Sequence, residues 1–213
     1  MPQKSEISKL RQKARAITRE LERLFPGARI VLKFSNPWEC MVAVQLSAQC
    51  TDKKVNEVTA VLFKKYRTLD DYVHATPREF EQAIKPTGFY HNKAKNILAA
   101  AKVVKDRFGG TLPRTIEEMI TIPGVGRKTA NVVLGSVYGI SEGIAVDTHV
   151  RRLVRQWGLT THQDPEKIER DLMALLPKDS WYAWTYRVIE YGRNYSPARK
   201  RDHHDEPLAR FYV

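Results

Sequence analysis

Lys128 is the residue of this chain whose surroundings best suit it for nucleophilic chemistry. It follows the stretch IPGVGR directly, at a point where a helix is expected to begin. The positive end of the helix dipole and the neighbouring Arg127 should both favour the neutral, nucleophilic form of the lysine amine. The simpler alternative is a solvated lysine, or one that contacts a phosphate group.

Asp147 offers a carboxylate at a second defined position. The apolar run Ile144–Val146 follows a break at Gly143 and delivers this aspartate to the start of another expected helix. A carboxylate can stabilise positive charge in a transition state, but Asp147 could also serve only as the N-cap of that helix. The two roles are compatible, because a capping bond fixes the direction of the carboxylate. Nearby His149 is more simply a structural histidine, which at most would support the catalytic residues.

The turn before Lys128 has the features of a phosphate-binding corner. Two short helices are expected on either side of it, over residues 115–120 and 129–138. Gly124 and Gly126 can take positive φ and carry no side chain, so the backbone can approach a bulky anion. The N–H groups at the start of the second helix lack helical partners, and the dipole makes that end positive. A tight turn that needs glycine only for steric reasons is the alternative.

The charge of the whole chain indicates an anionic partner. Its 213 residues include 36 Lys+Arg and 24 Asp+Glu, which gives a net charge of +12. Lys and Arg attract the phosphates of nucleic acids by a long-range, salt-sensitive force. We expect no membrane span, because no run of about 18 apolar residues occurs, and the N-terminal stretch lacks the apolar core of a secretory signal. Two cysteines, Cys40 and Cys50, are too few for a disulfide framework and suit a reducing compartment.

Capping residues and periodic apolar residues predict an all-α fold. Asn36, Thr76 and Asp164 each precede a proline, a pattern typical of helix starts. Apolar stripes at helical spacing mark the expected helices, and the period-two alternation that would indicate strands is absent. The stripes are Leu10, Ala14, Ile17, Leu21 and Leu24; Val55, Val58, Leu62 and Tyr66; Ile97, Ala101, Val104 and Phe108; Ile168, Leu172 and Leu175; and Trp181, Trp184, Val188 and Tyr191.

Several segments resemble the endonuclease III family of DNA glycosylases, in the same order along the chain. The glycine turn at about residues 115–138 resembles the family's helix-hairpin-helix element, and VDTH at residues 146–149 follows it. LSAQCTD at residues 46–52 and TGFYHNKA at residues 87–94 fit the same family. The similarity spans about residues 20–195. With a lysine at position 128, the chain resembles the bifunctional branch of the family, whose members also cleave the DNA strand.

The resemblance implies parts for individual residues. Lys128 would attack C1′ of the damaged nucleotide, and Asp147 would stabilise the positive charge that develops on the sugar. Gln49 and Phe89 would fill the space left by the extruded base, with Phe89 standing where bacterial relatives carry leucine. A structural glutamine at a helix end and a core phenylalanine are the alternatives. The other residues expected to contact DNA are Gly124, Val125, Gly126, Arg127, Thr129, His149, Arg193 and Lys200.

A cofactor typical of the family has no ligands in this sequence. Family members hold a [4Fe–4S] cluster with four cysteines near the C-terminus, whereas no cysteine follows Cys50 here. We therefore expect no cofactor and no metal. Cys40 is expected on the same helix as Cys50, about 15 Å away along the axis, too far to share a metal or a disulfide. The run DHHDE at residues 202–206 has metal-ligand residue types but is more simply a solvated tail.

The resemblance also implies a domain organisation and an activity. We expect two helical lobes, residues 30–142 with the hairpin and residues 1–29 with 143–213, and duplex DNA in the cleft between them. The expected activity is excision of damaged, mainly oxidised, pyrimidines in base excision repair, with β-elimination at the abasic site. A monofunctional uracil or mismatch glycosylase and a non-catalytic DNA-binding module are the alternatives. We expect a monomer in the cytoplasm, associated with the nucleoid if the source is bacterial.

Overall fold

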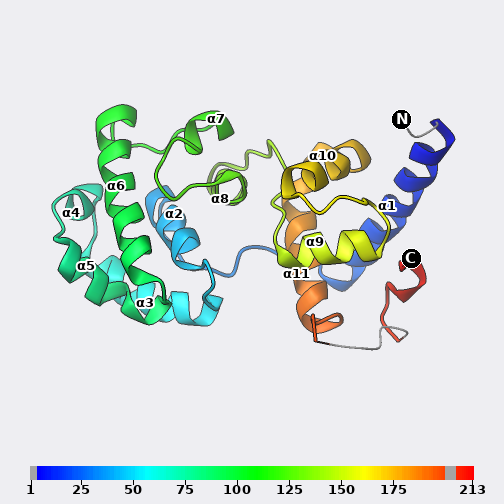
Figure 1. Cartoon of the computed structure of the whole chain (residues 1–213), viewed down its shortest axis with the longest axis horizontal. Coiled ribbons are helices and arrows are strands. Elements are labelled where there is room, and N and C mark those ends of the chain that lie inside the picture. The colour runs from blue at the N-terminus through cyan, green and yellow to red at the C-terminus, as the bar shows by residue number, and fades with distance from the viewer. Residues whose placement is uncertain (1–3, 200–204) are drawn as a thin grey trace. The chain divides into compact units, whose positions relative to one another are not determined.

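The structure, a computed structural model, describes residues 4–199 and 205–213. Within these residues every regular element is helical, which confirms the predicted all-α fold (Figure 1). No helix in this part of the chain is both long and apolar enough to cross a membrane. Short 3₁₀-helices cover Lys85–Thr87, Lys178–Ser180 and Ala209–Phe211, and a π-helix covers Leu134–Tyr138. The α-helices are α1 Lys4–Leu24, α2 Pro37–Leu46, α3 Asp52–Lys65, α4 Leu69–Val73, α5 Pro77–Ile84, α6 Tyr90–Phe108, α7 Ile116–Met119, α8 Arg127–Val133, α9 Thr148–Gln156, α10 Pro165–Leu175 and α11 Trp181–Asn194.

The predicted capping residues start their helices as expected. The Asn36 side chain accepts a hydrogen bond from the Glu39 N–H at the start of α2. Thr76 caps α5 and Asp164 caps α10 in the same way, each with a proline as the first helical residue. Each cap satisfies an N–H group that has no partner within the helix and stabilises the helix by about 1 kcal/mol.

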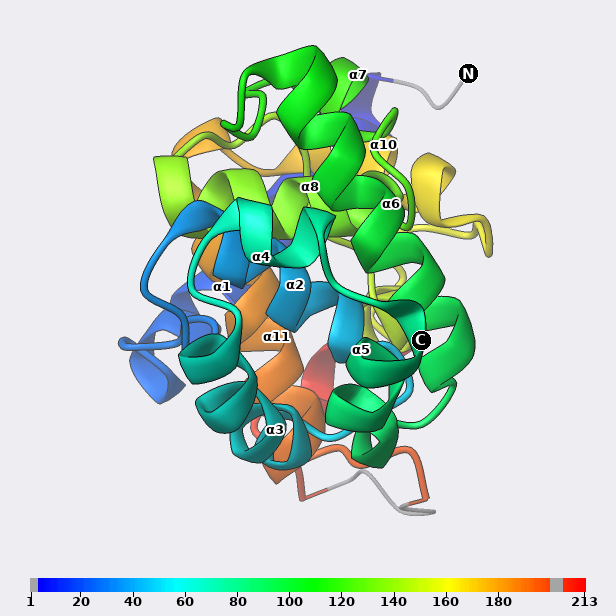
Figure 2. The same ribbon diagram turned by 90° about the vertical axis from the view of Figure 1, so that its left-hand side faces the viewer.

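The chain forms two compact units, and the one made of Val31–Glu142 contains α2 to α8. In this unit α6 packs against α4 and α5, and α2 packs against α8 (Figure 2). The predicted stripes of α3 and α6 are buried in it, apart from the partly exposed Phe108. An aromatic cluster of Trp38, Tyr66, Tyr72 and Phe80 joins α2, the end of α3, α4 and α5, with ring centroids 5.2–5.7 Å apart. Such pairs add about 0.5–1.5 kcal/mol each beyond burial of their area.

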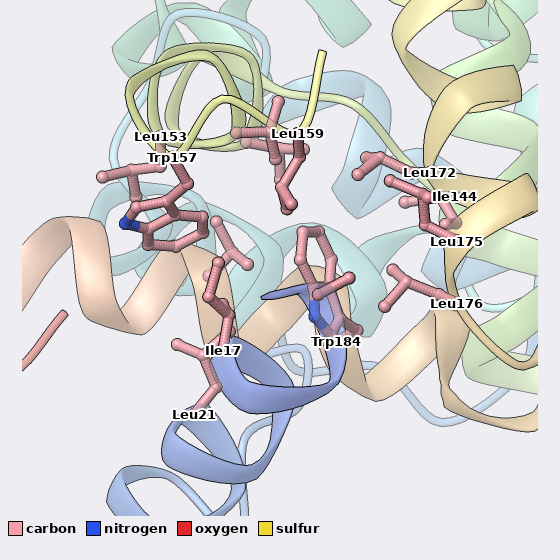
Figure 3. Close-up of a cluster of buried hydrophobic side chains, with 14 of the residues drawn as sticks. Ile17, Leu21, Ile144, Leu153, Trp157, Leu159, Leu172, Leu175, Leu176 and Trp184 are labelled. Carbon is pink, nitrogen blue, oxygen red and sulfur yellow. The ribbon is translucent and has the colours of Figure 1, made fainter. Parts of the chain in front are cut away.

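The other unit combines the described residues up to Ile30 with those from Gly143 onward. Figure 3 shows its core, in which Ile17 and Leu21 of α1 lie with Leu153 of α9, with Trp157 directly after that helix, and with Trp184 of α11. All five side chains are fully buried. This core explains why the two ends of the sequence fold together: the apolar stripe of α1 can leave water only against the C-terminal helices.

The last residues of the chain pack against this second unit. Leu208 is fully buried, and its N–H donates to the Tyr191 hydroxyl at 3.1 Å. The Tyr191 hydroxyl donates in turn to the buried Glu206 carboxylate at 3.2 Å, which also accepts from the Tyr212 hydroxyl. Arg152 donates to the Ser196 hydroxyl at 3.1 Å. Hydrogen bonds and one buried leucine thus hold the segment 205–213 in place.

One local expectation about the segment after α2 is wrong. Cys40 and Cys50 do not share a helix, because α2 ends at Leu46 and Cys50 lies in the connection to α3. Both cysteines are free thiols. The cap of α3 is Thr51, whose side chain accepts from the Lys54 N–H at 3.3 Å, and Asp52 is the first helical residue. A left-handed residue, Gln49, turns the chain between the two helices.

Candidate active site

Lys128 is the second residue of α8, and its side chain is exposed. The helix begins two residues earlier than the sequence indicated, and its last part changes into the π-helix that starts at Leu134. Gly126 occupies the N-cap position and has no side chain to accept from the first-turn N–H groups. That end of α8 therefore presents donors and a positive dipole beside an exposed amine, an arrangement suited to an anionic group.

The hairpin before α8 depends on Gly124 for close packing. Gly124 has a φ of 74°, and a Cβ there would stand 2.7 Å from Gln45 Oε1 and 2.8 Å from Asn96 Cβ. The buried Gln45 side chain also donates to the Pro123 carbonyl at 3.3 Å. Gly126 differs, because a Cβ there would meet nothing within 4 Å. Gly124 is thus needed for packing, and Gly126 leaves its side of the turn open.

The remaining residues of the hairpin divide between its interior and its surface. Val125 is buried, and its N–H donates to the Ile122 carbonyl at 3.0 Å, so this residue builds the turn. Arg127 and Thr129 are partly exposed. Gly124 and Gly126 are both exposed.

Asp147 is the N-cap of α9, as the sequence predicts for its local role. One of its carboxylate oxygens accepts from the Val150 N–H at 2.8 Å. The segment before it is fixed by two side chains of the same unit: the Ile144 N–H donates to buried Glu169 at 3.1 Å, and the Ala145 carbonyl accepts from Thr185 at 3.5 Å. The helix cap and the fixed segment before Asp147 therefore both hold the carboxylate in one direction.

His149 is the second residue of α9 and packs against Gly192 of α11. A Cβ on Gly192 would stand 2.4 Å from His149 Nδ1, so only glycine fits there. Burial lowers the pKa of His149, while the Asp147 carboxylate opposes that shift. These contacts support the structural reading of this histidine. Arg193 follows Gly192 directly and is exposed, with an ion pair of 3.4 Å to Glu190. Lys200 lies outside the described residues.

Gln49 and Phe89 share an unusual backbone conformation. Their φ values are 52° and 49°, and in the described chain no other non-glycine residue has a positive φ. Such a conformation costs about 1–3 kcal/mol and persists where surrounding structure enforces it, often at functional sites. Both side chains are exposed, and Phe89 retains 64% of its accessible surface. The alternative that Phe89 belongs to the hydrophobic core is therefore wrong.

Three residues that hold parts of the site in place were not predicted from the sequence. They are Gln45, which contacts the hairpin, Glu169, which fixes the segment before Asp147, and Lys93, which is buried beside the turn of Phe89. The sequence does indicate burial of Lys93, because this residue lies four residues before Ile97 on the same apolar stripe of α6. A charged residue in such a stripe is buried only with partners.

The residues near the C-terminus do not fit an iron–sulfur cluster. Such a cluster needs thiolate ligands, whereas the polar groups that the structure describes here include oxygens of Tyr191, Ser196, Glu206 and Tyr212, which hydrogen-bond to one another or to neighbouring protein groups. No cysteine occurs beyond Cys50. Among the described residues, no group of three or more His, Cys, Asp or Glu side chains could hold a metal ion. The DHHDE run lies largely outside the described residues.

Comparison with known proteins identifies the family. The model of the HhH-GPD superfamily, base excision DNA repair proteins, matches residues 42–178, more than half of the chain. Endonuclease III of Synechocystis sp. is 45% identical over 89% of this chain and 87% of the relative. Endonuclease III of Bacillus subtilis is 45% identical over 83% of this chain and 80% of the relative. A solved structure of a trapped endonuclease III–DNA covalent intermediate aligns with a TM-score of 0.91 at 40% identity, over 95% of each chain.

The chain therefore belongs to the HhH-GPD superfamily of base excision DNA repair proteins. The relatives compared above are endonuclease III proteins, and the activity of this chain is that of a bifunctional DNA glycosylase with AP lyase activity.

Proposed function

We propose that this enzyme excises oxidised pyrimidines from duplex DNA and then cleaves the strand at the abasic site. The observation that carries the proposal is the placement of two side chains at helix starts. Lys128 is exposed in the first turn of α8, and Asp147 is fixed by its cap at the start of α9. Phosphate binding alone would require neither a capped aspartate nor a lysine at this position. The trapped covalent DNA intermediate of a similar protein supports a covalent step.

The proposed chemistry begins with base release. The neutral amine of Lys128 attacks C1′ of the damaged nucleotide, and the glycosidic C1′–N bond breaks, so that its electron pair leaves with the base. The Asp147 carboxylate stabilises the positive charge that the sugar carries in this step. The attached amine gives up a proton, and the C1′–O4′ bond breaks, so that O4′ becomes a hydroxyl and an iminium bond forms between C1′ and Lys128 Nζ. Loss of a proton from C2′ then drives cleavage of the C3′–O bond, and the 3′ phosphate leaves by β-elimination. Water finally hydrolyses the iminium linkage and frees the Lys128 amine.

The proposed DNA contacts come from the hairpin and two exposed side chains. The open side at Gly126 and the first-turn N–H groups of α8 would bind a backbone phosphate. Gln49 and Phe89 would enter the duplex and replace the extruded base, since a planar aromatic ring can stack between neighbouring bases. The net charge of +12 would favour duplex DNA as the partner.

We further propose that the enzyme works without an iron–sulfur cluster, as a monomer in the cytoplasm. The oxygen-donor network of Tyr191, Glu206 and Tyr212 supports the first part, because these groups hold the C-terminal segment without thiolates. Iron analysis of the purified protein, before and after anaerobic incubation with iron and sulfide, is the direct measurement. Four iron atoms per chain would overturn this part of the proposal.

Borohydride trapping tests the central chemistry. The protein is incubated with a duplex that carries one abasic site, borohydride is added, and a covalent protein–DNA adduct is sought. We expect the adduct with the unmutated protein and with Lys102→Ala, an exposed lysine of α6 that serves as a matched control, but not with Lys128→Ala. Retention of the adduct in Lys128→Ala would exclude Lys128 as the nucleophile.

Two other outcomes would favour the remaining alternatives. Release of uracil or a mismatched base without any adduct would indicate a monofunctional glycosylase of this fold. Tight DNA binding without turnover on any substrate, unaffected by Asp147→Asn, would indicate a binding module. A panel of duplexes with oxidised pyrimidines, uracil and mismatches separates these outcomes.

A further inference from the structure

Lys93 is a buried lysine that the proposed chemistry does not use. It lies in the first turn of α6 and retains 7% of its accessible surface. Its Nζ donates two hydrogen bonds of 2.8 Å, one to the Leu46 carbonyl and one to the Thr87 carbonyl. Burial of an ammonium is costly unless its donors are paired, so these two bonds are what keeps Lys93 inside the protein.

The two acceptors belong to the turns that carry Gln49 and Phe89. Leu46 is the last residue of α2, three residues before Gln49, and helix-end carbonyls of this kind lack helical partners. Thr87 lies two residues before Phe89 in the second turn. Lys93 also binds that turn through its backbone, because its N–H donates to the Phe89 carbonyl at 3.1 Å. One side chain therefore ties together two segments that are 47 and 6 residues away from it along the chain.

Both turns adopt conformations that need external support. The left-handed φ values of Gln49 and Phe89 each cost about 1–3 kcal/mol, and neither residue is glycine or asparagine. The exposed side chains cannot supply that support through their own packing. The adjacent carbonyls can supply it, because they are fixed by a common donor in the protein interior.

We propose that Lys93 is a positioning residue that sets Gln49 and Phe89 at a fixed separation, so that both enter the duplex together. This inference rests on the proposed insertion of these two residues into DNA. Lys93 would act only through the two turns, because its buried Nζ is directed to their backbone carbonyls. Its loss lets the two turns move independently and weakens base extrusion more than the chemistry that follows extrusion.

Lys93→Met tests the proposal, because methionine keeps the length of the side chain and removes the donors. Single-turnover rates are measured on two duplexes, one with a paired oxidised pyrimidine and one with a preformed abasic site. We expect about 10- to 100-fold slower base excision, the loss typical of misplaced groups. Nicking of the abasic duplex should fall less than about threefold, because no paired base must be unstacked there. Lys95→Met, an exposed lysine on the same helix, is the matched control and should leave both rates unchanged.

Base extrusion can also be followed without turnover, by the fluorescence of 2-aminopurine placed beside the lesion. The fluorescence rise on binding should be lost in Lys93→Met and kept in Lys95→Met, even if the proposed cleavage chemistry were absent. If Lys93→Met does not fold, Lys93→Gln, which keeps one shorter donor, carries the same comparison. Equal losses on both duplexes, or an unchanged excision rate in a folded variant, would overturn the positioning role.

Discussion

The carboxylate of Asp147 accepts a hydrogen bond of 2.8 Å from the backbone N–H of Val150, and this bond starts helix α9. The same side chain is the proposed stabiliser of positive charge on the sugar. One residue thus combines a structural bond with a catalytic charge, and substitutions can separate the two.

Asp147→Asn should keep the cap and lose the charge, because the amide oxygen can still accept from Val150. We expect an unchanged melting temperature and at least about 100-fold slower base excision, since one preorganised electrostatic group is worth about that factor. Asp147→Ala should lose both, with about 1 kcal/mol less stability. Thermal melts and single-turnover rates measure the two effects. Excision by Asp147→Asn at the unmutated rate would remove the carboxylate from the mechanism.

The two glycines of the hairpin should respond differently to alanine. Gly124→Ala should destabilise the protein by about 1–3 kcal/mol, the usual cost of overpacking, because its Cβ would meet Gln45 and Asn96 and its φ is positive. Gly126→Ala has open space and an extended φ of −90°, so stability should hold. DNA binding should nevertheless weaken, because a methyl group keeps phosphate away from the backbone. Denaturant titration and DNA-binding assays on both variants check this contrast.

His149 should make stability depend on pH in the acid range. Its pKa is lowered by burial in the folded protein, so below about pH 6.5, the ordinary value, the unfolded chain binds a proton that the folded protein resists. The free energy of unfolding should therefore fall as pH falls below that value, by less than about 1.4 kcal/mol per pH unit. The charged groups around this ring are Asp147, Arg152, Arg193 and Glu190.

His149→Gln should flatten this part of the stability profile. Urea titrations at several pH values between neutrality and mild acid, for the variant and the unmutated protein, measure the slope. The same slope in both proteins would mean that other groups cause the acid sensitivity.

Tyr212→Phe should loosen the C-terminal segment. Burial raises the pKa of Tyr212 to about 12, so its hydroxyl stays protonated at neutral pH and donates to buried Glu206. Loss of one donor to a buried carboxylate costs about 1–3 kcal/mol. Tyr90→Phe, in the other unit, is a suitable control for the loss of a hydroxyl. Hydrogen exchange of residues 205–213 should speed up in Tyr212→Phe alone; unchanged exchange would mean that Leu208 packing suffices.

A raised tyrosine pKa also has a consequence at alkaline pH. Above about pH 10 the unfolded chain loses the Tyr212 proton while the folded protein retains it. The stabilisation by this residue is therefore complete below that value and is lost as pH rises through about 12. An alkaline stability loss that is smaller in Tyr212→Phe is the expected result.

The sequence alone determined the helices and the chemical character of the site. Caps such as Asn36, Thr76 and Asp147 act on N–H groups three residues away, and apolar stripes follow the 3.6-residue period of one helix, so both are local properties that residue order contains. Lys128 and Asp147 could be placed at helix starts for the same reason. The absence of cysteine near the C-terminus is likewise visible in the residue order.

Only the tertiary structure decided how those elements are held. The bond from Lys93 to Leu46 joins residues 47 positions apart, and the close approach of Gly124 to Gln45 depends on α2 meeting the hairpin. The left-handed turns at Gln49 and Phe89 contradict the local preferences of their residue types, so packing between distant segments must stabilise them. Such contacts depend on which helices become neighbours, and local patterns in a single sequence do not contain that information.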